Sequence, residues 1–291
     1  MMSVHIRNFG MTADSKEVHL YTLESVSGMR VSVTDLGGML QEVSVPDGKG
    51  GFIDVALGYD GASGYLRFGG SLGAIIGRNA NRIAGASFDL GGTTHRLTNN
   101  DGENNIHSGP HVWRKRLWDV AEDPKDDPDG GASITFGLVS RDGDQGFPGA
   151  ADVRATYTLH PDWRLELALE AQVTKTTIVN LTSHAYWNLN GHASGSVLRH
   201  SFSLDADAYT PVGKGLIPTG EIAPVEGTPY DLRESTNFEN RLYALPDGLD
   251  TNFVLKNDER LEKVATLVGD ETGISMDLYT DAPGLQVYTG C

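Results

Sequence analysis

The chain has 291 residues and a formal net charge of −16, with 23 Lys and Arg against 39 Asp and Glu. Nucleic acids and anionic membranes attract clustered basic residues, so this balance argues against both as partners. The single cysteine, residue 291, excludes an intramolecular disulfide framework. Because the N-terminus has no signal-peptide pattern and no run of 18 residues is apolar, we expect a cytoplasmic protein.

Apolar and polar residues alternate with a period of two along most of the chain, which predicts half-buried β-strands. The best candidate for a helix is residues 234–245, and residues 59–66 are a candidate for a single helical turn. The acidic stretch 122–130 is predicted to be a solvated hairpin loop, because the strand pattern resumes at Ser133. The alternating runs are 18–26, 31–33, 41–45, 133–139, 154–159, 164–173, 264–268 and 274–279.

Strands without intervening helices predict antiparallel sheets, so the expected fold class is all-β, a large antiparallel β-sandwich. Apolar residues make up 39% of the chain, which is enough for a substantial core. We find no internal repeat and treat residues 1–291 as a single domain. The chain stops within an apolar alternation, so we expect this domain to be truncated at its C-terminus.

Two short motifs are better explained by turns than by chemistry. Residues 69–73 fit the G-x-S-x-G pattern of a nucleophile elbow, but residues 74–77 continue as a strand where that motif needs a helix. His107 and His111 are four residues apart, a spacing that pairs metal ligands only on a helix. Gly109-Pro110 lies between them and opposes a helix, so we expect no metal site.

The segment 77–83 has two arginines flanking two asparagines. Taken alone, it is read slightly better as a surface turn with solvated charges. The alternative is a set of hydrogen-bond donors for hydroxyl groups, because each guanidinium presents five fixed N–H groups.

His184 lies where a strand passes into an aromatic segment. A lone histidine in a strand is more often a satisfied core residue, but Tyr186 and Trp187 favour a binding site, since aromatic faces commonly line small-molecule sites. Asp250 could open a turn before the next strand. Gln286 alternates with two apolar neighbours and is therefore expected to face away from their core.

Six segments occur in order along the chain: GRNANRI (77–83), NNIHSG (104–109), LTSHAYWNL (181–189), GTPYDLR (227–233), GLDTNF (248–253) and APGLQVYTG (282–290). Together they resemble the aldose 1-epimerase family, also called galactose mutarotases. The resemblance implies a galactose mutarotase-like β-sandwich with an open sugar cleft and no cofactor. It also implies interconversion of the α and β anomers of free hexoses such as galactose and glucose, by a monomer or a homodimer.

The resemblance also implies residue roles. By matching motif, His184 is the general acid that protonates the pyranose ring oxygen. His107 and Arg82 hold and polarise the sugar beside that oxygen. Asn81, Asp250 and Gln286 stand where the family places groups that bind sugar hydroxyls.

Two features depart from the family pattern. The family's general base is a glutamate downstream of the motif at 282–290, so none of the 291 residues is assigned this role and we expect slow catalysis by the chain alone. Asn79 and Ser108 stand where small or apolar residues and glycine, respectively, are frequent. Two rival functions stay open: a hexose-6-phosphate 1-epimerase of the same fold, which the net charge disfavours, and a non-catalytic sugar-binding protein.

Overall fold

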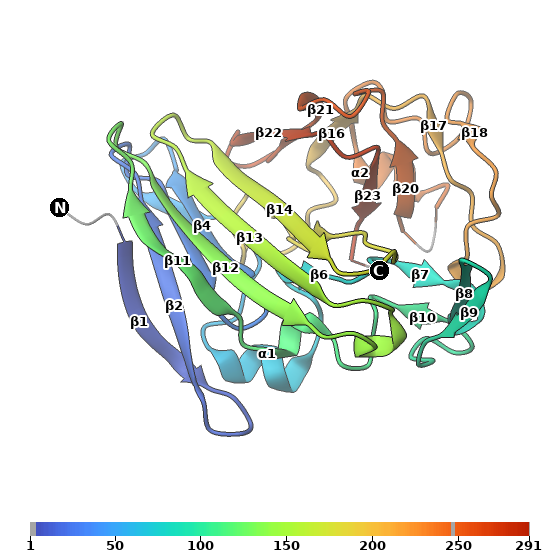
Figure 1. The fold of residues 1–291 in the computed structure, drawn as a ribbon. Coiled ribbons are helices and arrows are strands. Elements are labelled where there is room, and N and C mark those ends of the chain that lie inside the picture. Colours follow the sequence, from blue (N-terminus) through green and yellow to red (C-terminus); the bar gives the residue numbers. More distant parts are fainter. Residues whose placement is uncertain (1–3, 246–247, 291) are drawn as a thin grey trace. The chain divides into compact units, whose positions relative to one another are not determined.

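The computed structural model describes residues 4–245 and 248–290 (Figure 1). Its regular structure is mostly strands, and every pairing between the labelled strands in this part of the chain is antiparallel. The prediction of an all-β, antiparallel sandwich is therefore confirmed. Contacts between Cα atoms divide the chain into two compact units, Met1–Trp187 and Asn188–Cys291, which we describe separately.

Two long sheets form the framework of the first unit (Figure 1). One has the strand order β1-β2-β3-β4-β5 and the other the order β11-β12-β13-β14. Both are meanders in which consecutive strands pair. Their bounds are β1 (Val4–Met11), β2 (Glu17–Glu24), β3 (Arg30–Thr34), β4 (Met39–Pro46), β5 (Phe52–Asp54), β11 (Asp119–Asp126), β12 (Ala132–Ser140), β13 (Ala151–Leu159) and β14 (Leu165–Val173).

The alternation along β2 places side chains on both faces of its sheet. Tyr21 faces the second sheet, where its ring meets the Phe136 ring edge-on with centroids 5.5 Å apart. The Tyr157 hydroxyl of that second sheet donates a 2.7 Å hydrogen bond to the Gly38 carbonyl oxygen. On the other face, Leu20 packs in a buried cluster with Tyr65 of the short helix α1 (Ala62–Phe68).

Short strand pairs connect these sheets. They are β6 (Ile75–Ile76) with β15 (Thr182–Ser183), β7 (Arg82–Ile83) with β10 (Asn105–Ile106), and the hairpin β8 (Ser87–Leu90) with β9 (Thr93–Arg96). The G-x-S-x-G segment is a turn, as predicted: Gly73 has a φ of +67°, and β6 follows it. These small pairs carry most of the candidate site.

The second unit has two four-stranded sheets, of order β19-β16-β21-β22 and β18-β17-β20-β23. Phe202 and Leu204 from the first of them and Phe253 and Val287 from the second share one buried cluster. The bounds are β16 (Ser201–Leu204), β17 (Ala208–Tyr209), β18 (Ala223–Pro224), β19 (Thr236–Asn237), α2 (Phe238–Leu242), β20 (Asp250–Val254), β21 (Glu262–Val268), β22 (Ser275–Thr280) and β23 (Gly284–Tyr288).

Two element predictions differ from the structure. The helix expected at 234–245 is reduced to the five residues of α2. The acidic stretch is a strand as far as Asp126, with the hairpin turn at 127–131. β11 tolerates Pro124 because it is an edge strand, where a missing N–H breaks no ladder on its outer side. In the described ranges, none of the helices combines the length and apolar character that a membrane crossing requires.

Candidate active site

One continuous segment, residues 73–83, lies between the two histidine-bearing segments of the first unit. β6 at its start pairs with β15, so that Ile75 is opposite Ser183. β7 at its end pairs with β10, so that Arg82 is opposite Ile106. His184 directly follows β15, and His107 directly follows β10. Two antiparallel ladders on a shared segment therefore position both imidazoles.

His184 is held by its main chain on this shared segment. Its N–H donates to the Ala74 carbonyl oxygen at 2.9 Å, and its own carbonyl oxygen accepts from the Gly73 N–H at 2.9 Å. The half-buried imidazole meets the His107 ring nearly edge-on, with centroids 5.3 Å apart and planes at 81°. Its other neighbour is the Tyr186 ring, stacked at 5.1 Å and 21°. The interpretation of His184 as an isolated core histidine is therefore wrong.

His107 is held with one ring nitrogen already used. Its main-chain N–H donates to the Asn81 carbonyl oxygen at 3.1 Å, and the Asn81 N–H donates to His107 Nδ1 at 3.1 Å. Burial lowers the pKa of His107 to about 4, and the charges of His184, Arg82 and Arg114 lower it further than Asp101 raises it. His107 is therefore neutral at pH 7. Because Nδ1 accepts a hydrogen bond, the ring proton must be on Nε2.

Arg82 is oriented by a carboxylate that the sequence analysis did not identify. Its Nε–H donates to Asp101 Oδ2 at 2.8 Å, and its side chain is only 14% exposed. Asp101 itself lies in a tight turn, where its N–H donates to the Asn104 carbonyl oxygen and its carbonyl oxygen accepts from the Asn104 N–H. The Arg82 main-chain N–H also donates to Asn81 Oδ1 at 2.9 Å. The guanidinium thus has a fixed direction and a partly compensated charge.

Asparagine side chains hold the loop that leads into His107. Asn100 bonds both main-chain groups of Ile106: Nδ2 donates to its carbonyl oxygen, and Oδ1 accepts from its N–H. The buried Asn105 donates to the carbonyl oxygens of Thr98 and Gly109. These amides take the place of a regular ladder and fix the loop without any secondary structure of its own.

Arg78 is fully buried, which contradicts the interpretation of segment 77–83 as a solvated surface turn at this position. Its guanidinium donates to the carbonyl oxygens of Pro148 and Gly149 at 2.9 and 2.7 Å, and to Ser140 Oγ at 2.8 Å. The Phe147 ring lies 5.8 Å from its charged carbon. Only Arg82 is in the position that the hydroxyl-donor hypothesis requires.

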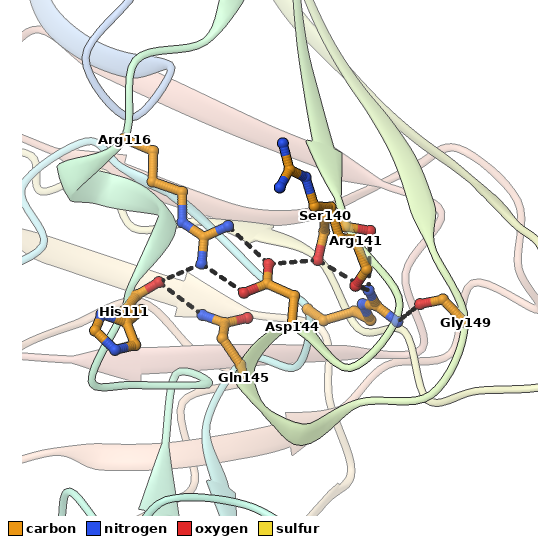
Figure 2. Close-up of polar contacts among 8 residues, drawn as sticks. His111, Arg116, Ser140, Arg141, Asp144, Gln145 and Gly149 are labelled. Carbon is orange, nitrogen blue, oxygen red and sulfur yellow. Dashed lines mark hydrogen bonds and ion pairs between the residues drawn. The ribbon is translucent and has the colours of Figure 1, made fainter.

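The turn that Arg78 holds is in turn bonded to the loop after His107 (Figure 2). Asp144 receives two hydrogen bonds from Arg116, at 2.7 and 2.9 Å, and one from Ser140 Oγ at 2.7 Å. Arg116 and Gln145 both donate to the His111 carbonyl oxygen. Burial raises the pKa of Asp144, but the bonds from Arg116 and Ser140 outweigh it, so this pKa lies below its ordinary value. We call these five residues, together with Arg78, the Arg78 brace.

The other two predicted residues belong to the second unit. Asp250 begins β20 and Gln286 lies in β23, on neighbouring strands of one sheet. Gln286 Nε2 donates to Asp250 Oδ1 at 2.7 Å. Gln286 is exposed and Val287 is buried, so the predicted orientation of Gln286 away from the core is confirmed. The two side chains form a single polar pair.

Comparison with known proteins decides the family. The model of the family "Aldose 1-epimerase" matches residues 19–291. A galactose mutarotase of Sus scrofa is 38% identical over 292 residues, covering 100% of this chain and 83% of the relative. The chain belongs to the aldose 1-epimerase family.

Other members of the aldose 1-epimerase family agree with this result. An aldose 1-epimerase of Escherichia coli (strain K12) is 34% identical, covering 96% of this chain and 81% of the relative. The crystal structure of a galactose 1-epimerase from Lactobacillus acidophilus NCFM superimposes with a TM-score of 0.87 and 28% identity, over 100% of this chain and 83% of that one. The galactose mutarotase-like fold is therefore confirmed, and the family is one of carbohydrate isomerases.

Proposed function

We propose that this chain interconverts the α and β anomers of free hexoses such as galactose and glucose, by general acid–base ring opening and reclosure. The observation that carries the proposal is the meeting of the His107 and His184 rings at 5.3 Å, with Arg82 and Asn81 on the segment between them. Membership in the aldose 1-epimerase family supports the same reaction class.

The chemistry requires only proton transfers. A proton leaves the anomeric hydroxyl and another adds to the ring oxygen, so the C1–O5 bond breaks and an aldehyde forms. Rotation about C1–C2 and reclosure then give the other anomer. A positioned imidazole suits the protonation step, because its ordinary pKa near 6.5 lets it donate a proton at neutral pH.

The two histidines take different roles in this proposal. His184 is the general acid that protonates the ring oxygen. His107, neutral and carrying its proton on Nε2, polarises the sugar as a hydrogen-bond donor and does not transfer a proton. Arg82, directed by Asp101, binds beside it as a fixed cation, and Asn81 binds a hydroxyl. None of the 291 residues is assigned as the general base.

Asp250 and Gln286 are proposed to bind sugar hydroxyls. A carboxylate accepts and a carboxamide both donates and accepts, so the pair matches the two-way hydrogen bonding of a hydroxyl. Their mutual 2.7 Å hydrogen bond orients the amide, which leaves less conformational entropy to lose on binding.

Polarimetry of freshly dissolved α-galactose with the purified chain tests the proposal. We expect the rotation to relax faster than without protein, and His184→Gln to reduce the protein-dependent rate by about 10²-fold or more, the usual contribution of one acid–base group. His95→Gln, on the β8–β9 hairpin, is the control and should keep the wild-type rate. A chain that leaves the spontaneous rate unchanged would contradict the proposal.

Two additional measurements separate the rivals. A higher rate with glucose 6-phosphate than with glucose would identify the hexose-6-phosphate 1-epimerase. Galactose binding by calorimetry, without any acceleration in the polarimeter, would identify the non-catalytic sugar-binding protein.

A further inference from the structure

Two consecutive residues after β10 adopt a conformation that side chains rarely take. His107 has a φ of +52° and Ser108 a φ of +55°. The left-handed region costs a residue with a Cβ roughly 1–2 kcal/mol, and such residues persist only where the surroundings enforce them. Ser108 is fully buried. The interactions that hold this turn therefore deserve a close account.

The ladder between β7 and β10 would end at this turn if only main-chain groups were available. Ile106 is opposite Arg82, and His107 N–H still reaches the Asn81 carbonyl oxygen at 3.1 Å. Beyond that, the left-handed residues turn the main chain away. The Ser108 hydroxyl makes the next connection: it accepts from the Asn79 N–H at 2.8 Å and donates to the Asn79 carbonyl oxygen at 3.0 Å.

The hydroxyl thus stands in for one rung of main chain. Asn79 is secured on its other side by a parallel bridge to Asn180, so the rung is anchored to two segments. Between the rungs at Asn79 and Asn81 lies the contact that determines the chemistry of His107, the hydrogen bond from Asn81 N–H to Nδ1. This bond requires the ring and the Asn81 main chain to keep their mutual register.

We propose that Ser108 is a positioning residue whose hydroxyl, bonded to both main-chain groups of Asn79, keeps His107 in register with Asn81 and so holds its imidazole in the Nε2–H tautomer. The inference rests on the proposed function for the use of that N–H, which donates to the sugar. The tautomer itself is a property of the free protein. It can be measured whether or not the sugar binds.

The test uses a pair of variants that separate the hydroxyl from the backbone conformation. Ser108→Ala removes the hydroxyl and keeps the conformational cost of a Cβ at φ +55°. Ser108→Gly also removes the hydroxyl but relieves that cost, so it should be the more stable of the two. Ser25→Ala is the control: this buried serine lies near the β2–β3 turn, and its hydroxyl contacts Ser27 Oγ and the Met29 carbonyl oxygen.

Nitrogen-15 NMR of the imidazole rings at pH 7.5 is the first readout. Wild type and Ser25→Ala should show His107 with a protonated Nε2 and an unprotonated Nδ1. Ser108→Ala and Ser108→Gly should both show a mixture of tautomers. Calorimetry is the second readout: the Kd for galactose should rise about three- to tenfold in both, as expected for one weakened hydrogen bond.

Each outcome decides the matter. Tautomer mixing in both variants supports the proposal, even if galactose does not bind to wild type, in which case the proposed function fails by itself. If Ser108→Ala does not fold, the more permissive Ser108→Gly gives the answer. A pure Nε2–H pattern in the folded variants, or a wild-type His107 that carries its proton on Nδ1, would overturn the inference.

Discussion

The charge around His107 comes from several residues that are far apart in the sequence. Arg82, Arg114 and His184 all lower its pKa, whereas Asp101, the partner of Arg82, raises it. Burial is the largest cause. A donor that stays neutral needs this surplus of positive surroundings, because any added proton on Nδ1 would displace the hydrogen bond from Asn81.

This environment predicts a pH dependence of stability. In the unfolded chain His107 takes up a proton near pH 6.5, whereas in the folded chain it does so only near pH 4, so the free energy of unfolding falls as the pH decreases between these values. The loss from this residue is about 3 kcal/mol by pH 4, from the difference in pKa. His107→Gln cannot titrate, so its free energy of unfolding should decrease less over this range.

Urea denaturation of wild type and His107→Gln at pH 7.5 and pH 4.5 measures that difference. NMR titration of the His107 ring gives an independent check, with a midpoint expected near pH 4. Parallel pH profiles of the two proteins, or a midpoint near 6.5, would contradict the assigned environment.

The site residues differ in how well the sequence predicted them. His107, His184 and Arg82 were found because they stand within short motifs. Asp101, Arg78 and Ser108 were missed as functional or structural partners, although two of them lie inside the quoted motifs. Their roles depend on partners 19, 62 and 29 residues away, respectively, in hydrogen bonds that no local pattern reveals.

At the scale of elements, the Arg78 brace joins three stretches of irregular chain. Arg78 precedes β7, Ser140 ends β12, and Arg116 follows the turn that carries His111. A buried guanidinium satisfies several carbonyl oxygens at once, which suits loops that lack a ladder. The brace therefore supports the segments on which both Asn81 and His107 lie.

Removing the carboxylate of the brace should destabilise the chain. Asp144→Ala leaves Arg116 without its ion-pair partner and Ser140 Oγ without its acceptor, so we expect the free energy of unfolding to decrease by about 3 kcal/mol. Urea denaturation measures it. Asp162→Ala is the control, because Asp162 is exposed and lies 4.0 Å from Arg164, and it should unfold like wild type. Equal stabilities of the two variants would show that the brace contributes nothing.

The elements were predicted well where one face of a strand is buried. All eight alternating runs lie largely in strands, because a period of two is maintained whenever one side packs on a core. The pattern failed for short or two-residue strands such as β7 and β10, which have no room for a period. It also failed at 234–245, where helical spacing extends beyond the five-residue α2.

At the scale of the whole molecule, the open question is whether two compact units unfold as one domain, as the sequence analysis expects. All four tryptophans lie in the first unit, at positions 113, 118, 163 and 187. Tryptophan fluorescence therefore monitors that unit, whereas far-ultraviolet circular dichroism monitors the strands of both.

A core substitution in the second unit tests this expectation. Phe253 is fully buried, so Phe253→Ala should lower the free energy of unfolding by about 3–5 kcal/mol. In a single cooperative domain, fluorescence and circular dichroism should shift together to the same lower midpoint. Tyr243→Ala is the control, because this side chain is 95% exposed and its removal should shift neither. A fluorescence transition that keeps its wild-type midpoint would reveal two domains.

The shared position of residues 73–83 has a consequence for engineering. Both imidazoles take their placement from the same eleven residues, so inserting or deleting one amino acid there would slip two ladders together and reverse which side each following residue faces. Substrate libraries should therefore keep this stretch constant in length. Diversity is better introduced at the tip of the β8–β9 hairpin, where Gly91 and Gly92 have open space around them.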